Sequence, residues 1–301
     1  MRKGLRLGVD LGGTRVKLGL VDERGRVLDR RAVDTVADPR ALARAVWIAA
    51  RPWMERGVRG TGVGVAGDVD AARGVVRLAP NLGWRGVSVA RHFRAAGWTG
   101  PLCFENDATA AAWGAYHMEL HCRVGSLVLI ALGTGVGGGL VFNGALYRGA
   151  TGSAGEIGHL VVDPKGPRCG CGGRGCLETY LGAVGLSAEA ARRDAARGRK
   201  NTDVTPLDLA RRARRGDPVA RAVWDRAGRA LGAALANLVN TLNPEVILFT
   251  GGVARAAPLF LPTARRILRA TAFPAPARAA RFRVSRDPES LGLVGAALLV
   301  E

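Results

Sequence analysis

The sequence contains no long apolar run. None of its 301 residues lies in a stretch that approaches the ~18–20 uninterrupted apolar residues that a membrane-spanning helix needs. The first residues, MRKGLRLGVDLGG, lead directly into a glycine-rich motif without an apolar leader, so we expect no signal peptide. These absences argue against a helical membrane protein and against a membrane partner.

Cysteine is scarce, and its odd number argues against a disulfide framework. Of the five cysteines, Cys169, Cys171 and Cys176 lie within eight residues of one another. Cysteines clustered in this way suit metal binding in a reducing compartment better than disulfides in a secreted protein. We therefore expect a cytoplasmic protein.

Lysine is almost absent, although the formal net charge is +19, because 40 of the 44 basic residues are arginine. A basic chain can attract nucleic acid, but the arginine-dense stretch 192–229 has no interleaved series of aromatic residues on which bases would stack. We interpret the charge as an arginine-biased composition on solvated helical faces. No nucleic-acid partner is expected.

The remaining composition is that of a globular protein. Hydrophobic residues make up 48% and charged residues 23%, and the mean hydropathy is +0.09. A chain of this length exceeds the usual size of a single hydrophobic core, so two domains of roughly 100–200 residues are expected.

Two series of short apolar runs, glycine turns and helical patterns follow each other along the chain. The first series predicts strands at 5–10, 15–21, 26–33, 62–66, 75–78 and 102–104, with helices at 39–55, near 89–95 and from 106. The second predicts strands at 126–132, 137–142, 145–147, 246–250 and 281–284, with helices at 207–215, 219–242, 262–271 and 290–300. The repetition predicts an α/β architecture in which each half is a mixed sheet flanked by helices. We place a smaller N-terminal domain at 1–118, joined by the C-terminal helix 290–301, and a larger domain at 119–289.

Glycine-rich turns between apolar strands indicate a nucleotide site. Such turns, at 10–14 and 132–139, let backbone N–H groups approach a phosphate. Asp10 would face the Mg²⁺ of the nucleotide, Thr134 would add a hydroxyl donor, and Gly251-Gly252 would pass close to a nucleoside. Each turn alone equally suits a hairpin or a bulge, but the three together predict nucleotide binding. The predicted nucleotide-binding residues are Asp10, Gly12, Gly13, Thr14, Lys17, Gly133, Thr134, Gly135, Gly137, Gly251 and Gly252.

A carboxylate follows the strand predicted at 102–104. Glu105-Asn106-Asp107 lies where that strand meets the N-terminus of a helix, a position from which side chains reach a cleft. Asp107 would act as a general base that accepts the proton of an attacking hydroxyl. Local sequence alone favours the alternative, namely a helix cap at Asn106 with Asp107 in the first turn.

The most specific motif is EIGH followed, after nine residues, by CGCGGRGCLE. His159, Cys169, Cys171 and Cys176 form the Cys₃His pattern of structural zinc. Glu156 and Glu178 flank these ligands, so a metal would hold both carboxylates rigidly as a platform for hydroxyl groups. His159 would bind zinc through one ring nitrogen and donate the other N–H to a substrate oxygen.

Taken together, DLGGT, ENDATAAAWG, LGTGVGGG, EIGH with CGCGGRGCLE, FTGGV and GLVGAAL resemble the ROK family over nearly the whole chain. The resemblance implies the ribonuclease H-like fold of actin and hexokinases, with ATP and a sugar in the interdomain cleft. It implies Asp107 as the base on the 6-hydroxyl of a hexose and a dimeric or tetrameric assembly. The sugar ligands that it implies are Gly67, Asn81, Asn106, Asp107, Glu156, His159 and Glu178.

Within the family, PNLGW at 80–84 looks most like the zinc-containing glucokinases, which implies conversion of glucose to glucose 6-phosphate at the entry of glycolysis. N-acetylmannosamine, N-acetylglucosamine, fructose and allose stay open as substrates, because specificity depends on the shape of the pocket near the 2-position. Ala66 replaces the proline of many relatives, and we expect a looser loop beside the sugar. A sugar-responsive repressor is the alternative of another class, but DLGGT begins at residue 10, and we expect no DNA-binding helix-turn-helix before it.

Overall fold

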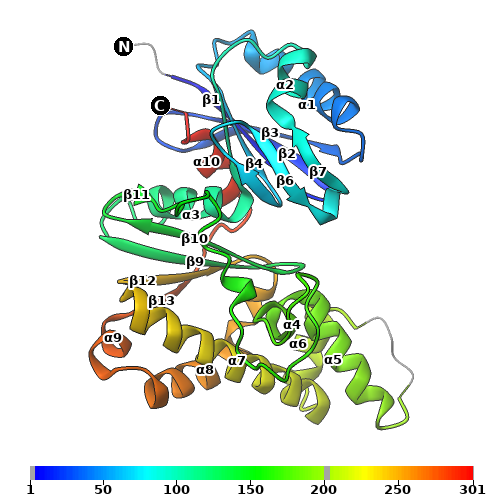
Figure 1. The fold of residues 1–301 in the computed structure, drawn as a ribbon, viewed down its shortest axis with the longest axis vertical. Helices are drawn as coiled ribbons and strands as arrows, with labels where there is room; N and C mark the ends of the chain where they lie inside the picture. The colour runs from blue at the N-terminus through cyan, green and yellow to red at the C-terminus, as the bar shows by residue number, and fades with distance from the viewer. Residues whose placement is uncertain (1–3, 200–203, 301) are drawn as a thin grey trace. The chain divides into compact units, whose positions relative to one another are not determined.

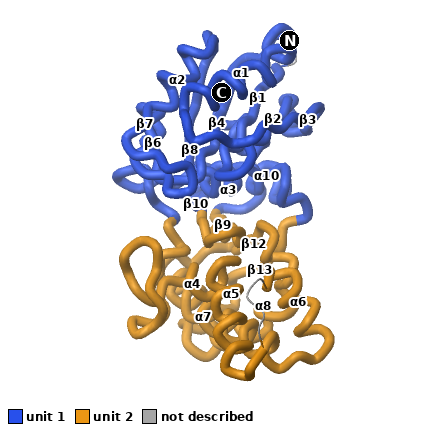
Figure 2. Tube along the Cα trace, turned by 90° about the vertical axis from the view of Figure 1, so that its right-hand side faces the viewer, with its two compact units in different colours: residues 1–125, 139–155, 286–301 blue, residues 126–138, 156–285 orange. Residues whose placement is uncertain are grey.

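The computed structural model describes residues 4–199 and 204–300. The chain forms two compact units, each assembled from separate segments (Figure 2). Unit 1 contains residues 1–125, 139–155 and 286–301, and unit 2 contains residues 126–138 and 156–285. The domain boundaries expected at 118 and 289 remain a prediction.

The first five-stranded sheet lies in unit 1 and has the order β3-β2-β1-β4-β8. Its strands are β1 (Arg6–Leu11), β2 (Arg15–Val21), β3 (Val27–Asp34), β4 (Thr61–Val65) and β8 (Leu102–Asn106). The first three strands pair antiparallel, whereas β4 pairs parallel with both β1 and β8. Parallel pairing brings the carboxyl ends of β1, β4 and β8 to one edge of the sheet, where polar residues follow each strand.

Helices cover both faces of this sheet (Figure 1). On one side lie α1 (Pro39–Met54) and α2 (Val89–Ala96), and on the other lie α3 (Asp107–Met118) and α10 (Leu291–Ala297). The backbone of α10 lies directly on the strands, so a Cβ at Gly62 would collide with the carbonyl oxygen of Ala296. Glycine in a strand is therefore used here for a close helix–sheet approach.

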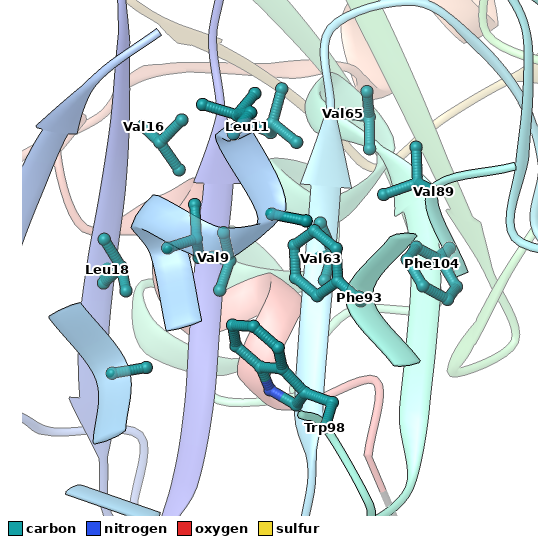
Figure 3. Packing of buried hydrophobic residues seen from close by; sticks show 14 of the residues in the cluster. Val9, Leu11, Val16, Leu18, Val63, Val65, Val89, Phe93, Trp98 and Phe104 are labelled. Carbon is teal, nitrogen blue, oxygen red and sulfur yellow. The ribbon is translucent and has the colours of Figure 1, made fainter. Parts of the chain in front are cut away.

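The core on the α1 and α2 side is fully buried. It combines alternate residues of the strands, such as Val9 and Val63, with Phe93 and Trp98 (Figure 3). Trp98 stacks obliquely on Phe93 with ring centroids 4.6 Å apart, and its indole N–H donates to Thr61 Oγ1 at 3.0 Å. Burial of large aromatic side chains dominates core energetics, and the buried indole N–H keeps a partner.

Unit 1 also contains a small antiparallel sheet of order β5-β6-β7. Its strands are β5 (Asp68–Asp70), β6 (Val75–Ala79) and β7 (Trp84–Ser88), and the 3-10 helix η1 (Pro80–Leu82) joins the last two. Only β6 was expected. The patterns of β5 and β7, with Gly67 and Gly83 beside them and Gly86 within β7, indicate turns, but pairing with β6 stabilises both segments as strands.

The second five-stranded sheet has the order β11-β10-β9-β12-β13. Its strands are β9 (Ser126–Leu132), β10 (Val136–Phe142), β11 (Ala145–Leu146), β12 (Val246–Thr250) and β13 (Arg281–Val284). Counted within each half, the strands of both sheets follow one order, third-second-first-fourth-fifth. The predicted duplication of one mixed α/β pattern is therefore confirmed.

The helices of unit 2 begin within the EIGH and CGCGGRGCLE segments and continue after them. They are α4 (Glu178–Leu181), α5 (Ala183–Ala195), α6 (Pro206–Arg214), α7 (Pro218–Leu242), α8 (Ala257–Thr271) and α9 (Pro274–Ala279), with the 3-10 helices η2 (Ile157–His159) and η3 (Val253–Ala256). Trp224 of α7 stacks on Phe260 of α8 with ring centroids 5.8 Å apart. This contact explains why α8 begins five residues before the predicted start at Pro262, since burial of Phe260 stabilises the first turns.

Ion pairs neutralise much of the arginine-dense stretch. Asp194, fully buried, accepts two hydrogen bonds from Arg212 at 2.6 and 2.8 Å, and Asp217 accepts another from Arg212 at 3.1 Å. Glu189 contacts three further guanidinium groups, those of Arg192, Arg193 and Arg226. Arginine here pins α5, α6 and α7 together and is not confined to solvated faces.

Within the described residues, no helix combines the length and apolar character that crossing a membrane requires.

Candidate functional site

The predicted residues fall into two groups, one in each unit. The first group lies in unit 1 and comprises Asp10, Gly12, Gly13, Thr14, Lys17, Gly67, Asn81, Asn106 and Asp107. The second lies in unit 2 and comprises Gly133, Thr134, Gly135, Gly137, Glu156, His159, Cys169, Cys171, Cys176, Glu178, Gly251 and Gly252.

The first glycine turn of unit 1 connects β1 to β2. Asp10 pairs across the ladder with Lys17, and burial raises the pKa of Asp10 while the ammonium of Lys17 opposes the rise. Thr35 holds the turn from outside, since its hydroxyl donates to Gly12 O at 2.7 Å. Carboxylate oxygens are ligands that Mg²⁺ prefers, and a divalent cation bound at the half-buried Asp10 would favour its ionised form against the effect of burial.

The same turn touches a predicted sugar residue. A Cβ at Gly13 would lie 3.0 Å from the Cβ of Asn81, which sits in η1. The structure thus brings Asn81 next to the predicted phosphate-binding turn, although 68 positions separate them in the sequence.

Asn106 and Asp107 lie at the junction of β8 and α3. Asn106 caps the helix by accepting the N–H of Thr109 at 2.9 Å, so the cap considered from the sequence is present. Its amide donates to Asp107 Oδ1 and to Gly67 O, both at 3.1 Å. Asp107 Oδ1 also accepts the N–H of Ala108 at 2.8 Å, and the side chain stays partly exposed. These donors orient a reachable carboxylate, which a general base needs.

The roles of Glu105 and Arg148 are not evident from motifs in the sequence. The side chain of Glu105 is 1% exposed, its Oε2 receives Arg148 Nε at 2.6 Å, and its Oε1 accepts the N–H of Asn106 at 3.0 Å. A charged residue closing an otherwise apolar strand was the available indication in the sequence. Burial of a carboxylate is costly without such partners.

The loop after Ala66 is firmly held. The backbone N–H of Ala66 donates to Leu11 O at 3.1 Å, a bond that proline could not make. Next to it, Asp68 binds Arg77 through both oxygens at 2.7 and 2.8 Å and accepts the hydroxyl of Ser153 at 2.8 Å. Arg77, followed by Ser153, lowers the pKa of Asp68 against the effect of burial. These hydrogen bonds hold the loop in place, although the replacement of proline by Ala66 led us to expect a looser loop.

In unit 2, the four predicted metal ligands converge. Their ligand atoms all lie within 4.8 Å of one another, and Cys171 Sγ is 3.7 Å from Cys176 Sγ. The Nδ1 of His159 faces Cys169 Sγ at 3.7 Å, while its Nε2 lies 3.8 Å from Glu156 Oε2. The histidine thus points one nitrogen to the cysteines and the other to a predicted sugar ligand.

The distance between the sulfur atoms of Cys171 and Cys176 fits a cation with tetrahedral coordination. Sulfur atoms bound to Zn²⁺ at about 2.3 Å stand roughly 3.8 Å apart at the corners of a tetrahedron. Burial raises the pKa of Cys176 to about 12 and also raises that of Cys169, whereas the backbone N–H of Gly173 leads the groups that lower the pKa of Cys171. Thiols with raised pKa values bind a divalent cation only as thiolates, so binding would release their protons and would depend on pH. The four residues can therefore hold a metal ion.

Glu178 connects the cluster of candidate metal ligands to the second glycine turn. Its Oε2 accepts the N–H of Val136 at 3.0 Å, and its Oε1 lies 3.9 Å from Cys169 Sγ. The turn itself is anchored by Ala183, whose N–H donates to Gly133 O at 3.0 Å. Glu178 is thus in contact both with a predicted phosphate-binding turn and with a predicted metal ligand.

The pair Gly251-Gly252 of unit 2 directly follows β12. Gly251 has a positive φ of 91°, and a Cβ there would collide with Leu132 O at the end of β9. The two carboxyl ends therefore touch, as expected for parallel neighbours. Nothing lies within 4 Å of a Cβ at Gly252 or at Gly133, so both backbones are open.

The chain is similar to known proteins over nearly its whole length, including all the candidate site residues. The family model described as the ROK family matches residues 6–301. The glucokinase of Streptomyces coelicolor is 35% identical over 277 residues, 87% of this chain and 86% of that protein. A ROK family glucokinase from Streptomyces griseus, solved in complex with glucose and AMPPNP, is 34% identical with a TM-score of 0.83 and 99% of both chains covered. The ROK hexokinase from Thermus thermophilus is 34% identical with a TM-score of 0.80, covering 98% of this chain and 97% of that one.

Proposed function

The chain belongs to the ROK family, and we propose that it transfers the γ-phosphoryl group of ATP to the 6-hydroxyl of glucose. The expected fold class and the expected ATP-dependent hexose kinase are confirmed by its likeness to solved ROK sugar kinases. Glucose is favoured because the similar proteins from Streptomyces are glucokinases, one of them in complex with glucose and AMPPNP.

The observation that carries the proposal is the partly exposed carboxylate of Asp107, oriented at the β8–α3 junction by Asn106 and Ala108. Asp107 accepts the proton of the 6-hydroxyl while that oxygen forms a bond to the γ-phosphorus. The bond from the γ-phosphorus to the β,γ-bridging oxygen breaks, and ADP leaves with that electron pair. Gly67, Asn81 and Asn106 hold the hydroxyl groups of the sugar on this side.

Unit 2 supplies the second set of sugar ligands, Glu156, His159 and Glu178. The Cys₃His cluster fits Zn²⁺, which would be structural and would fix the orientation of the His159 ring. The ring nitrogen that faces Glu156 then donates to a sugar oxygen. Both glycine turns, together with Gly251 and Gly252, bind ATP, and Asp10 faces its Mg²⁺.

The enzyme acts in the cytoplasm, in carbohydrate metabolism, as a dimer or tetramer without nucleic acid. The clustered cysteines support a reducing compartment, and the family resemblance supports the assembly. Analytical ultracentrifugation of the full chain tests the assembly, and a monomer at micromolar concentration would contradict it.

A coupled assay of ADP release, run with ATP and a panel of hexoses, tests the activity. The panel contains glucose, fructose, allose, N-acetylglucosamine and N-acetylmannosamine. We expect the highest kcat/KM for glucose. Preference for another sugar would reassign the substrate, and no turnover with any hexose would refute the kinase.

A further inference from the structure

A closed ring of polar contacts in unit 1 surrounds the junction that carries the predicted base. We call it the polar ring, and its residues are Gly67, Asp68, Glu105, Asn106, Arg148 and Ser153. Three hydrogen bonds form the ring. Asn106 Nδ2 donates to Gly67 O at 3.1 Å, and Ser153 Oγ donates to Asp68 Oδ1 at 2.8 Å. Arg148 Nε donates to Glu105 Oε2 at 2.6 Å. Chain connections complete the circuit.

The segment 148–153 lies outside regular secondary structure, whereas the other members of the ring lie on or beside β5 and β8. It is closed on itself by the bond from Ala154 N to Arg148 O at 3.0 Å. Arg77 braces it further by donating to Thr151 O and to Ser153 Oγ, both at 2.9 Å. The segment is therefore fixed at one end to Glu105 of β8 and at the other end to Asp68 of β5.

The free energy of desolvating Glu105 is large compared with the stability that its ion pair with Arg148 can contribute. Glu105 is 1% exposed and Arg148 43% exposed. Desolvation of a carboxylate offsets much of the attraction within such a pair, and apolar residues of similar size are often as stable. The second oxygen of Glu105 accepts the N–H of Asn106, the residue immediately before the base. The pair thus acts on the backbone from which Asp107 projects.

We propose that Glu105 and Arg148 are positioning residues for phosphoryl transfer, which set the orientation of Asn106-Asp107 through the polar ring. The inference rests on the proposed function, because Asp107 must be the base and Gly67 and Asn106 sugar ligands. Loss of either partner leaves the other charge unpaired, loosens segment 148–153 and displaces the base from the 6-hydroxyl. Displacement of about 1 Å can lower a rate by as much as ~10²-fold.

Arg148→Gln is the test, and Arg26→Gln is its matched control. Arg26 pairs with the largely buried Asp22 at 2.7 Å in the turn between β2 and β3, outside the polar ring. Both variants lose one ion pair and should lose similar thermal stability. For Arg148→Gln we expect a kcat lower by roughly 10- to 100-fold and a higher KM for the sugar, with the KM for ATP unchanged. Arg26→Gln should keep the wild-type constants.

Two further variants guard against misfolding. Ser153→Ala removes one hydroxyl of the ring and should lower kcat less than Arg148→Gln does. The double variant Glu105→Gln with Arg148→Gln should be less impaired than the product of the two single effects, because the partners act as one unit. Wild-type sugar kinetics in folded Arg148→Gln, or fully multiplicative effects in the double variant, would overturn the positioning role. Absence of turnover in the wild type would instead refute the proposed function.

Discussion

The backbone N–H of Val136 donates a 3.0 Å hydrogen bond to Oε2 of Glu178. Val136 begins β10, directly after the glycine turn that is proposed to bind phosphate, and Glu178 begins α4, directly after the cysteine cluster. One carboxylate therefore links the glycine turn to the cluster of candidate metal ligands inside unit 2. We expect that a displacement of either element changes the position of the other through Glu178.

Gly135→Ala tests this link. A Cβ at residue 135 would collide with Oε2 of Glu178 and drive that carboxylate away from Val136. We expect a sugar KM raised by roughly tenfold, the effect of losing about 1.4 kcal/mol of interaction with a charged group. Steady-state kinetics in both substrates measure it. Gly133→Ala is the control, because nothing lies within 4 Å of a Cβ there, and an equal rise in its sugar KM would disprove the role of Glu178.

Asp107→Asn should abolish most turnover and preserve the fold. The amide still accepts the N–H of Ala108, but it does not accept the proton of the sugar hydroxyl. We expect kcat to fall by roughly 10²–10⁴, with nucleotide affinity and melting temperature nearly unchanged. Asp208→Asn, in the first turn of α6, is the control for loss of a helix N-terminal carboxylate. Turnover close to wild type would remove Asp107 from the mechanism.

Cys171→Ser should lower the zinc content and the sugar affinity together. Cys171 contributes one of the four clustered ligand atoms, so its loss opens the site that fixes His159 between the metal and Glu156. Metal analysis and glucose titration by calorimetry measure the two effects. Cys122→Ser removes an exposed thiol outside the cluster and should change neither. Normal glucose affinity in a zinc-free Cys171→Ser protein would break the linkage.

The acid stability of unit 2 should depend on Asp217. Burial opposes its ionisation, but the N–H of Ala220, Arg212 and the N–H of Val219 outweigh burial and lower its pKa to about 2 from the ordinary 3.8. A lowered folded-state pKa stabilises the protein above pH ~4, and that stabilisation disappears as the pH falls toward 2. At neutral pH it amounts to about 2 kcal/mol.

Asp217→Asn keeps a capping side chain on α7 and removes the charge. Urea denaturation at pH 7 should show the variant about 2 kcal/mol less stable, and the difference should shrink to roughly half at pH 3. An equal difference at both pH values would assign the loss to hydrogen-bond geometry and not to ionisation.

Local patterns predicted most regular elements of this chain. β2, β9, β12 and β13 have the predicted boundaries, because alternating apolar residues, as in β2 and β13, and continuous apolar runs, as in β9 and β12, both suit a strand. β5 and β7 were missed because their stability comes from pairing with β6, which local sequence does not contain. Helix α5 was missed as well; its pattern is weak, and its place is fixed by Glu189 and Asp194, which bind arginines of α6 and α7.

The sequence by itself determined the inventory of the candidate site: the glycine turns, the carboxylate at the end of a strand, and four clustered candidate metal ligands. Spacing alone is informative there because ligands a few residues apart cannot separate far. Only the tertiary structure decided the long-range pairs, such as Glu105 with Arg148, 43 residues apart, and Asp68 with Ser153, 85 apart. Such pairs depend on which strands become neighbours and on how loops close over them, and a desolvated charge finds its partner only after that topology has formed.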